Sequence, residues 1–213
     1  MVLLGVLNTY RGIWQAVQSR AGTGPGRLEL YGRILFFELL FLGIVIVGVR
    51  LRGVSLQTIF GKRWQSAGEV FRDLGLGVCL LVLSTIVGSV LAGHGGRAAD
   101  QAILYMIPQT SLELALWMVI SLAAGICEEA IFRGYLQRQF SALAKNVPVG
   151  IVLAAGAFGA SHLYQGFRRA AVIAIAAVVF GWFAHWRKTV RPGMVAHTLQ
   201  DAVAPLLLRA MRR

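Results

Sequence analysis

Six apolar stretches alternate with short polar breaks along this chain of 213 residues. Each stretch is close to the roughly 20 residues that an α-helix needs to cross a hydrocarbon core of about 30 Å. The stretches lie at about 33–49, 73–92, 111–132, 147–163, 169–186 and 193–208. The breaks between them are rich in Gly, Pro and basic residues, which end helices and lie in water or among headgroups. The pattern predicts an all-α fold, a polytopic membrane helix bundle with about six transmembrane helices.

Two further segments mix apolar and basic positions and predict helices that lie in the membrane interface. One is the N-terminal segment 1–32, which is too interrupted for a signal peptide and has no small-residue cleavage site. The other is residues 54–72, where Trp64 and other large apolar side chains alternate with Lys62 and Arg63. We therefore expect a single integral-membrane domain over residues 1–213.

Composition and charge support a membrane protein and argue against a nucleic-acid-binding one. Hydrophobic residues make up 57% of the chain and charged residues 14%, more apolar than a soluble domain can bury. The net charge of +12 is spread over the gaps between apolar stretches, so anionic lipid headgroups are the expected partners and nucleic acid is not. The two cysteines have neither zinc-site nor disulfide spacing, and they predict small core side chains.

Three polar groups lie within the apolar stretches, where a charge costs at least about 2.5 to 3.5 kcal/mol and therefore needs a reason. The first contains the adjacent carboxylates Glu128 and Glu129, with Arg133 four residues after the second on the same helical face. The second has Phe158 followed by His162, and the third has His197 followed by Asp201.

Each group has an ordinary structural explanation when it is taken alone. A Glu–Arg pair at a helix end is usually a structural clamp. An isolated intramembrane histidine usually makes a packing hydrogen bond, and a His–Asp pair at the start of a span is often an interfacial anchor. The combination, on three separate helices, predicts an acid and a base that meet in one cavity.

In this order the three groups form the pattern Glu-Glu-x-x-x-Arg-Gly, Phe-x-x-x-His and a late His-x-x-x-Asp. The pattern resembles the CAAX protease and bacteriocin-processing (CPBP) family of intramembrane peptidases, also called Abi or CAAX-prenyl-endopeptidase-like proteins. The resemblance covers a core of about residues 110–205; the first hundred residues are similar only in being hydrophobic helices.

The resemblance implies an endopeptidase that hydrolyses a peptide bond of a membrane-associated protein or peptide. It implies that Glu128 and His162 activate the attacking water and that His197 and Asp201 belong to the catalytic set. Glu129 and Arg133 would support the site. Phe158, which the motif places one turn before the histidine, would also support the site.

Asp201 departs from the family pattern, in which asparagine is the commoner residue at this position. An amide donates a hydrogen bond to an oxyanion, whereas an ionised aspartate repels it. Asp201 must then be protonated, orient His197, or help to bind a metal. A divalent ion such as zinc, held by Glu128, His162, His197 and Asp201, is the alternative to metal-independent chemistry, which we favour because the chain has no His-Glu-x-x-His motif.

Other polar residues within the apolar stretches match no family motif. Glu38 lies inside the first stretch and predicts a structural pair with a basic residue, while Glu113 favours a helix N-terminus. His185 stands beside Trp186 at the end of a span, where aromatic-belt residues gather.

The resemblance also indicates where the protein is located and which other functions are to be considered. We expect a protein of the prokaryotic cytoplasmic (inner) membrane, with membrane lipids and a protein or peptide substrate as partners, and an oligomer is possible. The rival function is a non-enzymatic membrane scaffold or bacteriocin-immunity protein with the same fold, because a fold does not guarantee turnover. A transporter is less favoured because the sequence lacks inverted repeats and paired broken helices.

Overall fold

A computed structural model describes residues 26–91 and 104–210, and these residues form helices with no strand. The elements in chain order are α2 (Arg27–Leu51), α3 (Gln57–Phe60), α4 (Ala67–Leu91), α6 (Ser111–Glu128), η1 (Glu129–Leu136), α7 (Gln137–Ala144), α8 (Val147–Ser161), η2 (Leu163–Gln165), α9 (Phe167–Arg187) and α10 (Arg191–Ala210). The all-α fold expected from the sequence is confirmed.

All six apolar stretches form helices, and within residues 26–91 and 104–210 four helical segments are long and apolar enough to cross a membrane. These four are α2, α4, α9 and a continuous 34-residue segment that joins α6, η1 and α7. Helix α8 has 15 residues, and at 1.5 Å per residue it spans only about 22 Å. Helix α10 is longer, but it carries the polar residues of the third motif.

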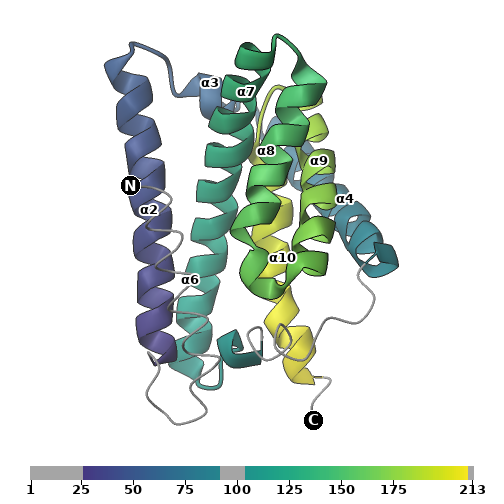
Figure 1. Cartoon of the computed structure of the whole chain (residues 1–213). Coiled ribbons are helices and arrows are strands. Elements are labelled where there is room, and N and C mark those ends of the chain that lie inside the picture. Colours follow the sequence, from purple (N-terminus) through teal and green to yellow (C-terminus); the bar gives the residue numbers. More distant parts are fainter. Residues whose placement is uncertain (1–25, 92–103, 211–213) are drawn as a thin grey trace.

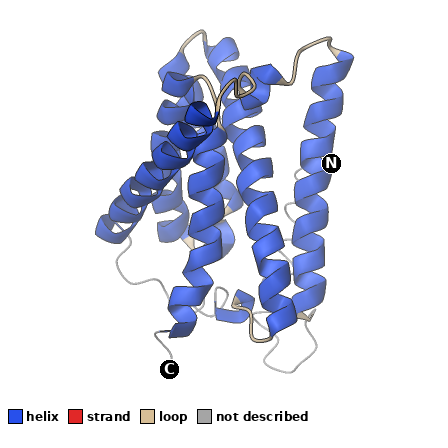
Figure 2. Ribbon diagram, turned by 180° about the vertical axis from the view of Figure 1, so that it is seen from behind, coloured by secondary structure: helices blue, strands red, loops and turns tan. Residues whose placement is uncertain are grey.

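The helices pack side by side around α10 (Figure 1). Helix α10 packs against α4, α6 and α9, while α8 packs against α7 and α9. Helix α2 packs on α6, and α4 crosses the back of the bundle at an angle (Figures 1 and 2). Because only 6% of the apolar window of α2 is buried, most of this helix presents apolar side chains outward, as a lipid-facing helix does.

Helix α10 approaches its neighbours closely where they carry glycine. A Cβ on Gly125 of α6 would lie 2.8 Å from the backbone N of Thr198, and one on Gly77 of α4 would lie 3.0 Å from the Pro192 carbonyl oxygen. Small residues at such crossings allow helix backbones to approach in membranes. These contacts hold the first turns of α10 in the centre of the bundle.

Helix ends follow local sequence signals. Thr110 and Glu113 form a capping box at the start of α6, and Asn146 caps α8. Lys145 and Lys188 adopt left-handed conformations (φ 49° and 56°) directly after α7 and α9. Glycine and asparagine are the usual residues at such positions, so both lysines occupy sites that a glycine would fit without cost.

The prediction of an interfacial helix at residues 54–72 is wrong. This segment forms only the four-residue α3, a loop, and the first turn of α4. Gly61 ends α3 with a φ of +91°, and the Thr189 hydroxyl donates a hydrogen bond of 2.9 Å to the Phe60 carbonyl. These tertiary contacts with the α9–α10 connection override the amphipathic pattern.

The other expected interfacial helix, in segment 1–32, lies mostly outside the described residues. Its last six residues, from Arg27 on, belong to α2.

Candidate active site

A wide helical turn presents the first motif to the centre of the bundle. The 34-residue helix changes from α to π geometry at Glu129 and returns to α geometry at Gln137. Such π segments are rare and occur frequently at functional sites. Glu128 is the last residue of α6, so the two adjacent carboxylates fall on either side of this transition.

Glu129 and Arg133 form a buried ion pair, as their spacing predicts. Glu129 Oε1 lies 2.8 Å from Arg133 Nη1, and the two side chains are 1% and 4% exposed. The contact is an ion pair without a hydrogen bond, because the N–H groups of Nη1 do not point at an acceptor among the described residues. The guanidinium also lies over the rings of Phe158 (4.2 Å) and Phe180 (5.3 Å), which adds cation–π attraction. Phe158 thus packs against the arginine of the first motif.

His197 on α10 lies among three carboxylates. Its Nδ1 is 3.2 Å from Glu129 Oε1, and its Nε2 is 3.4 Å from Glu128 Oε2 and 3.5 Å from Asp201 Oδ2. The carboxylates therefore fix the ring from both sides, and Asp201 contacts the histidine one turn earlier on the same helix. The sequence motifs do not anticipate the contact between Glu129 and His197.

His162 ends α8, and its Nδ1 faces the helix backbone. Nδ1 lies 2.9 Å from the Phe158 carbonyl oxygen and 3.1 Å from Ser161 Oγ. A carbonyl oxygen only accepts hydrogen bonds, so the bond to Phe158 requires Nδ1 to carry the proton. The neutral ring then has an unprotonated Nε2, which is free to accept a proton.

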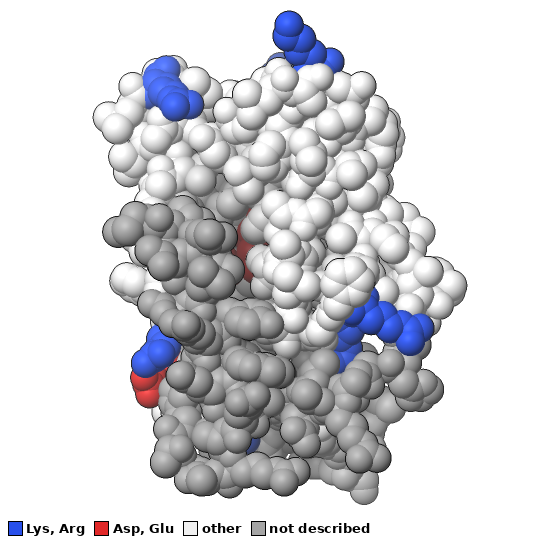
Figure 3. All heavy atoms as spheres, viewed as in Figure 1, with Lys and Arg blue, Asp and Glu red and all other residues white. Residues whose placement is uncertain are grey.

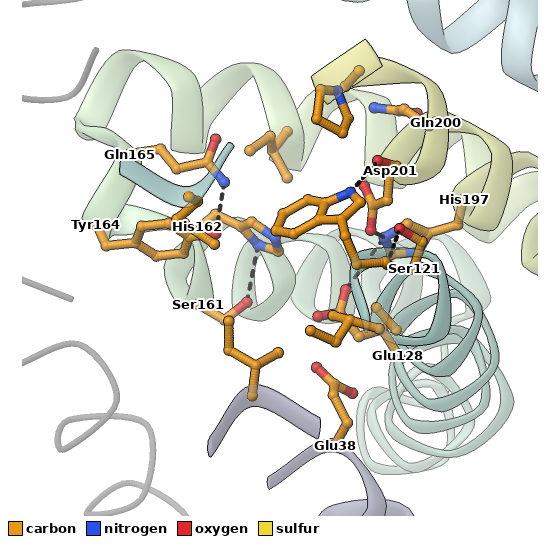
Figure 4. A pocket seen from close by; sticks show the side chains of 18 of the residues that line it. Glu38, Ser121, Glu128, Ser161, His162, Tyr164, Gln165, His197, Gln200 and Asp201 are labelled. Carbon is orange, nitrogen blue, oxygen red and sulfur yellow. Dashed lines mark hydrogen bonds and ion pairs between the residues drawn. The ribbon is translucent and has the colours of Figure 1, made fainter. Parts of the chain in front are cut away.

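The three motifs meet at one cavity of about 510 Å³. Glu128, His162, His197 and Asp201 all line it, and no hydrogen bond or ion pair joins Glu128 directly to His162 within the described residues. Figure 4 shows these side chains around the same space. On the face drawn in Figure 3, acidic atoms are visible inside a narrow hollow. Glu129 and Arg133 do not line this cavity; they lie behind His197.

The cavity wall is mainly apolar and comes from α2, α6, α8, α9 and α10. Apolar members include Phe37, Phe41, Ile120 and Ile173. Trp117 of α6 donates its indole N–H to the Asp201 carbonyl oxygen at 2.9 Å, which ties α6 to α10 beside the polar groups. An apolar wall with a few convergent polar groups is typical of a ligand or catalytic pocket.

The structure places Glu38 in this cavity, contrary to the structural pair with a basic residue expected from the sequence. Figure 4 shows Glu38 reaching from α2 toward Glu128. The two carboxylates interact electrostatically, and Asp201 acts on Glu38 as well. The signal in the sequence was an acidic residue in the middle of an apolar stretch, which by itself indicates an intramembrane functional residue.

The other two residues considered in the sequence lie elsewhere. Glu113 caps α6, where its carboxylate accepts hydrogen bonds from the backbone N–H groups of Gln109 and Thr110. His185, near the end of α9, lines a second, smaller cavity.

Metal binding was tested on the geometry of the same residues. Among residues 26–91 and 104–210, no three His, Cys, Asp or Glu side chains are arranged to hold a metal ion. The ring of His162 turns its Nδ1 to the backbone, while both nitrogens of His197 face carboxylates.

The fold and the site together define the class of protein: an integral-membrane helix bundle with an acid–histidine cluster at a buried cavity. Residues 110–203, a little under half of the chain, match the family of type II CAAX prenyl endopeptidase Rce1-like proteins. These residues are thus similar to the Rce1-like proteins of the CAAX protease family, and the resemblance drawn from the motifs is confirmed. Comparison with curated proteins and with solved structures gave no significant match. The family is one of intramembrane CAAX-type proteases, which supports peptidase activity in general terms.

Proposed function

We propose that this protein is an intramembrane endopeptidase in which Glu128 and His162 activate water to hydrolyse a peptide bond. The observation that carries the proposal is the convergence of Glu128, His162, His197 and Asp201, from separate helices, on one largely apolar cavity. An isolated clamp, packing histidine or interfacial anchor would not require the three motifs to share one space.

In the proposed reaction, Glu128 is the general base. Its Oε2 is buried and lies 3.4 Å from His197 Nε2, and the carboxylate, which lines the cavity, has further lone pairs that can accept a hydrogen bond from a water molecule. The carboxylate takes one proton as the water oxygen bonds to the peptide carbonyl carbon. It then returns that proton to the leaving nitrogen when the C–N bond breaks, so that a carboxylic acid and an amine are released.

His162 orients the same water. With Nδ1 donating to the Phe158 carbonyl, Nε2 is the acceptor that remains. Two acceptors on different helices, Glu128 and His162, would hold both hydrogens of one water and direct its oxygen lone pair at the substrate. Such positioning lowers the entropic cost of the attack.

His197 would stabilise the oxyanion, and Asp201 would orient it. When both nitrogens are protonated, the contacts with Glu128, Glu129 and Asp201 favour the imidazolium form by attraction of opposite charges. An imidazolium can stabilise negative charge on the carbonyl oxygen in the transition state. In this proposal Asp201 has the orienting role, one of the three that its departure from the asparagine of the family pattern leaves open.

Glu129 and Arg133 would be positioning residues. Their buried pair fixes one carboxylate oxygen against His197 Nδ1 while lying outside the cavity. Phe158 would support the site twice, because its ring packs against the Arg133 guanidinium and its carbonyl accepts from His162.

The apolar wall and lipid-facing helices favour a substrate that is itself membrane-associated. We propose a membrane protein or peptide precursor of a prokaryotic cytoplasmic membrane as substrate. An apolar segment of such a substrate would displace water from the wall on entry, which contributes about 25 cal/mol per Å² of apolar surface buried.

The experiment is cleavage of a peptide library by the detergent-purified full chain. Wild type is compared with Glu128→Gln and His162→Ala, each with and without a strong chelator. The control is Glu29→Gln, which changes an exposed glutamate of α2 outside the cavity. Loss of cleavage in both site variants, with chelator-resistant activity in wild type and control, is the expected result.

Two outcomes would overturn the proposal in different ways. Activity that a chelator abolishes and zinc restores would replace water activation by Glu128 with metal-dependent hydrolysis. A cellular phenotype that survives the combined Glu128→Gln and His162→Ala changes would support the non-enzymatic scaffold or immunity function instead.

A further inference from the structure

A second cavity of about 270 Å³ lies at the end of the bundle where α7 and α9 end and α8 begins. Its wall includes four basic-type side chains, Arg133, Arg138, His185 and Lys188. No acidic residue of the described chain lines it. A cavity with this lining suits a small, multiply charged anion.

Arg138 and Lys188, unlike Arg133 with its partner Glu129, line this cavity without a neutralising partner among the described residues. Lys188 and Arg138 are both close enough to His185 for their charges to repel its protonated form. Within residues 26–91 and 104–210, neither Arg138 nor Lys188 takes part in an ion pair or hydrogen bond. Uncompensated like charges around a concavity attract anions.

The neighbouring basic residue Arg187, in contrast, has an acidic partner that compensates its charge. Its guanidinium pairs with Asp73 of α4 at 3.3 Å, and it does not line the cavity. At this end of the bundle, a carboxylate therefore pairs with Arg187, whereas none lines the cavity among the described residues.

Arg133 forms the buried side of the cavity. Its guanidinium is 4% exposed and contacts Glu129 on the side of the first cavity. The exposed cations Arg138 and Lys188 stand nearer the solvent, so the uncompensated positive charge lies at the solvent side of the cavity. Gln137 and Ser141 add polar groups to the wall.

The length of the helix that carries Arg138 bears on the source of the anion. The helix Ser111–Ala144 has 34 residues and is about 51 Å long, which exceeds a hydrocarbon core of about 30 Å. A membrane centred on this helix would place Arg138, in its last two turns, at headgroup depth.

We propose that this cavity binds a phosphate-bearing anion, with Arg138 and Lys188 as its principal contacts. Phosphate presents several acceptor oxygens and up to two charges, which match an arginine fork and an ammonium group that converge on one space. The anion is either a phospholipid headgroup or a free phosphate. Neither the cavity nor its ligand depends on the proposed peptidase activity.

Two lysines of the chain provide a matched pair for the test. Lys145 and Lys188 both follow a helix in a left-handed conformation and both are exposed, but only Lys188 lines the cavity. Lys188→Gly and Lys145→Gly each replace a cation by the residue that this backbone conformation prefers, so both variants retain the fold. Arg138→Gln is a second cavity variant that does not alter the backbone.

The measurement is the thermal unfolding midpoint of the full chain in neutral detergent at constant ionic strength. The probes are inorganic phosphate, dihexanoyl phosphatidic acid and, as the zwitterionic control, dihexanoyl phosphatidylcholine. We expect a saturable rise in the midpoint with a phosphate probe, because a ligand that binds only the folded state stabilises it. Lys188→Gly and Arg138→Gln should weaken apparent affinity by about tenfold or more, and Lys145→Gly should match wild type.

The probes distinguish a phospholipid headgroup from free phosphate as the source of the anion. Equal responses to inorganic phosphate and phosphatidic acid identify the phosphate group as sufficient, while a response to phosphatidic acid alone identifies a lipid headgroup. Absence of a saturable response to both, an equal response to phosphatidylcholine, or equal weakening in Lys188→Gly and Lys145→Gly would overturn the proposal.

Discussion

The chain contains two Glu-x-x-x-Arg pairs of the same spacing in opposite environments, and they allow a direct test of the buried one. Glu129 and Arg133 have side chains 1% and 4% exposed, whereas those of Glu29 and Arg33 are both 52% exposed. Replacing Arg133 with Met removes the arginine partner and leaves the buried Glu129 carboxylate with His197 as its remaining contact. Such changes cost about 3 to 5 kcal/mol, to which lost cation–π contacts with Phe158 contribute.

The exposed pair of Glu29 and Arg33 is the reference for the free-energy cost of replacing the arginine. Arg33→Met should cost less than about 1 kcal/mol, because water screens an exposed ion pair. The double variant Glu129→Gln with Arg133→Met removes both buried charges. It should therefore cost less than the sum of its two single variants, with a coupling energy above about 1 kcal/mol.

The assay is reversible unfolding of the purified chain in mixed micelles, with the free energy of unfolding extrapolated to zero denaturing detergent. Arg133→Lys is informative too, because it keeps the charge but loses the planar group that stacks on Phe158. If Arg133→Met cost no more than Arg33→Met, or if the double variant were additive within about 0.5 kcal/mol, the buried pair would not stabilise the fold as argued here.

Two further predictions concern helix packing and capping. Gly125→Ala should destabilise the fold by about 1 to 3 kcal/mol in the same unfolding assay, because the new Cβ meets Thr198 of α10; Gly43→Ala, with nothing within 4 Å, should be neutral or slightly stabilising. Equal effects of the two would contradict the close α6–α10 contact. Thr110→Ala should cost about 0.5 to 2 kcal/mol by removing the hydroxyl that accepts from the Glu113 N–H, and Thr110→Ser should restore most of it.

Much of the arrangement could be predicted because membrane helices are specified by local signals. The apolar stretches and the breaks at Gly, Pro and basic residues locate the helices without tertiary information. The four-residue spacing likewise predicts the Glu129–Arg133 contact, which the structure places at 2.8 Å. The meeting of Glu128, His162 and His197 followed from the cost of polar groups in an apolar helix, because each needs a protein neighbour.

What could not be predicted depends on packing between distant segments. The amphipathic pattern around Trp64 is equally compatible with a membrane surface and with a loop docked on the protein. Only the contacts of Gly61 and Thr189 decide for the loop. Glu38 was expected to be structural because nothing local distinguishes a carboxylate that faces a cavity from one that meets a basic neighbour.

The π segment Glu129–Leu136 has a consequence for how this chain tolerates insertions and deletions. A π turn holds one residue more than the α-helical turn it replaces, since its hydrogen bonds run from i to i+5. A one-residue deletion there can be absorbed by a change from π to α geometry, so the residues after it keep nearly the same angle relative to α6. The same deletion within α6 would rotate everything after it by about 100°, and Arg138 would turn away from Lys188. The eight-residue π stretch is therefore where the long helix can lose one residue and keep the angular relation between the acidic and the basic cavity.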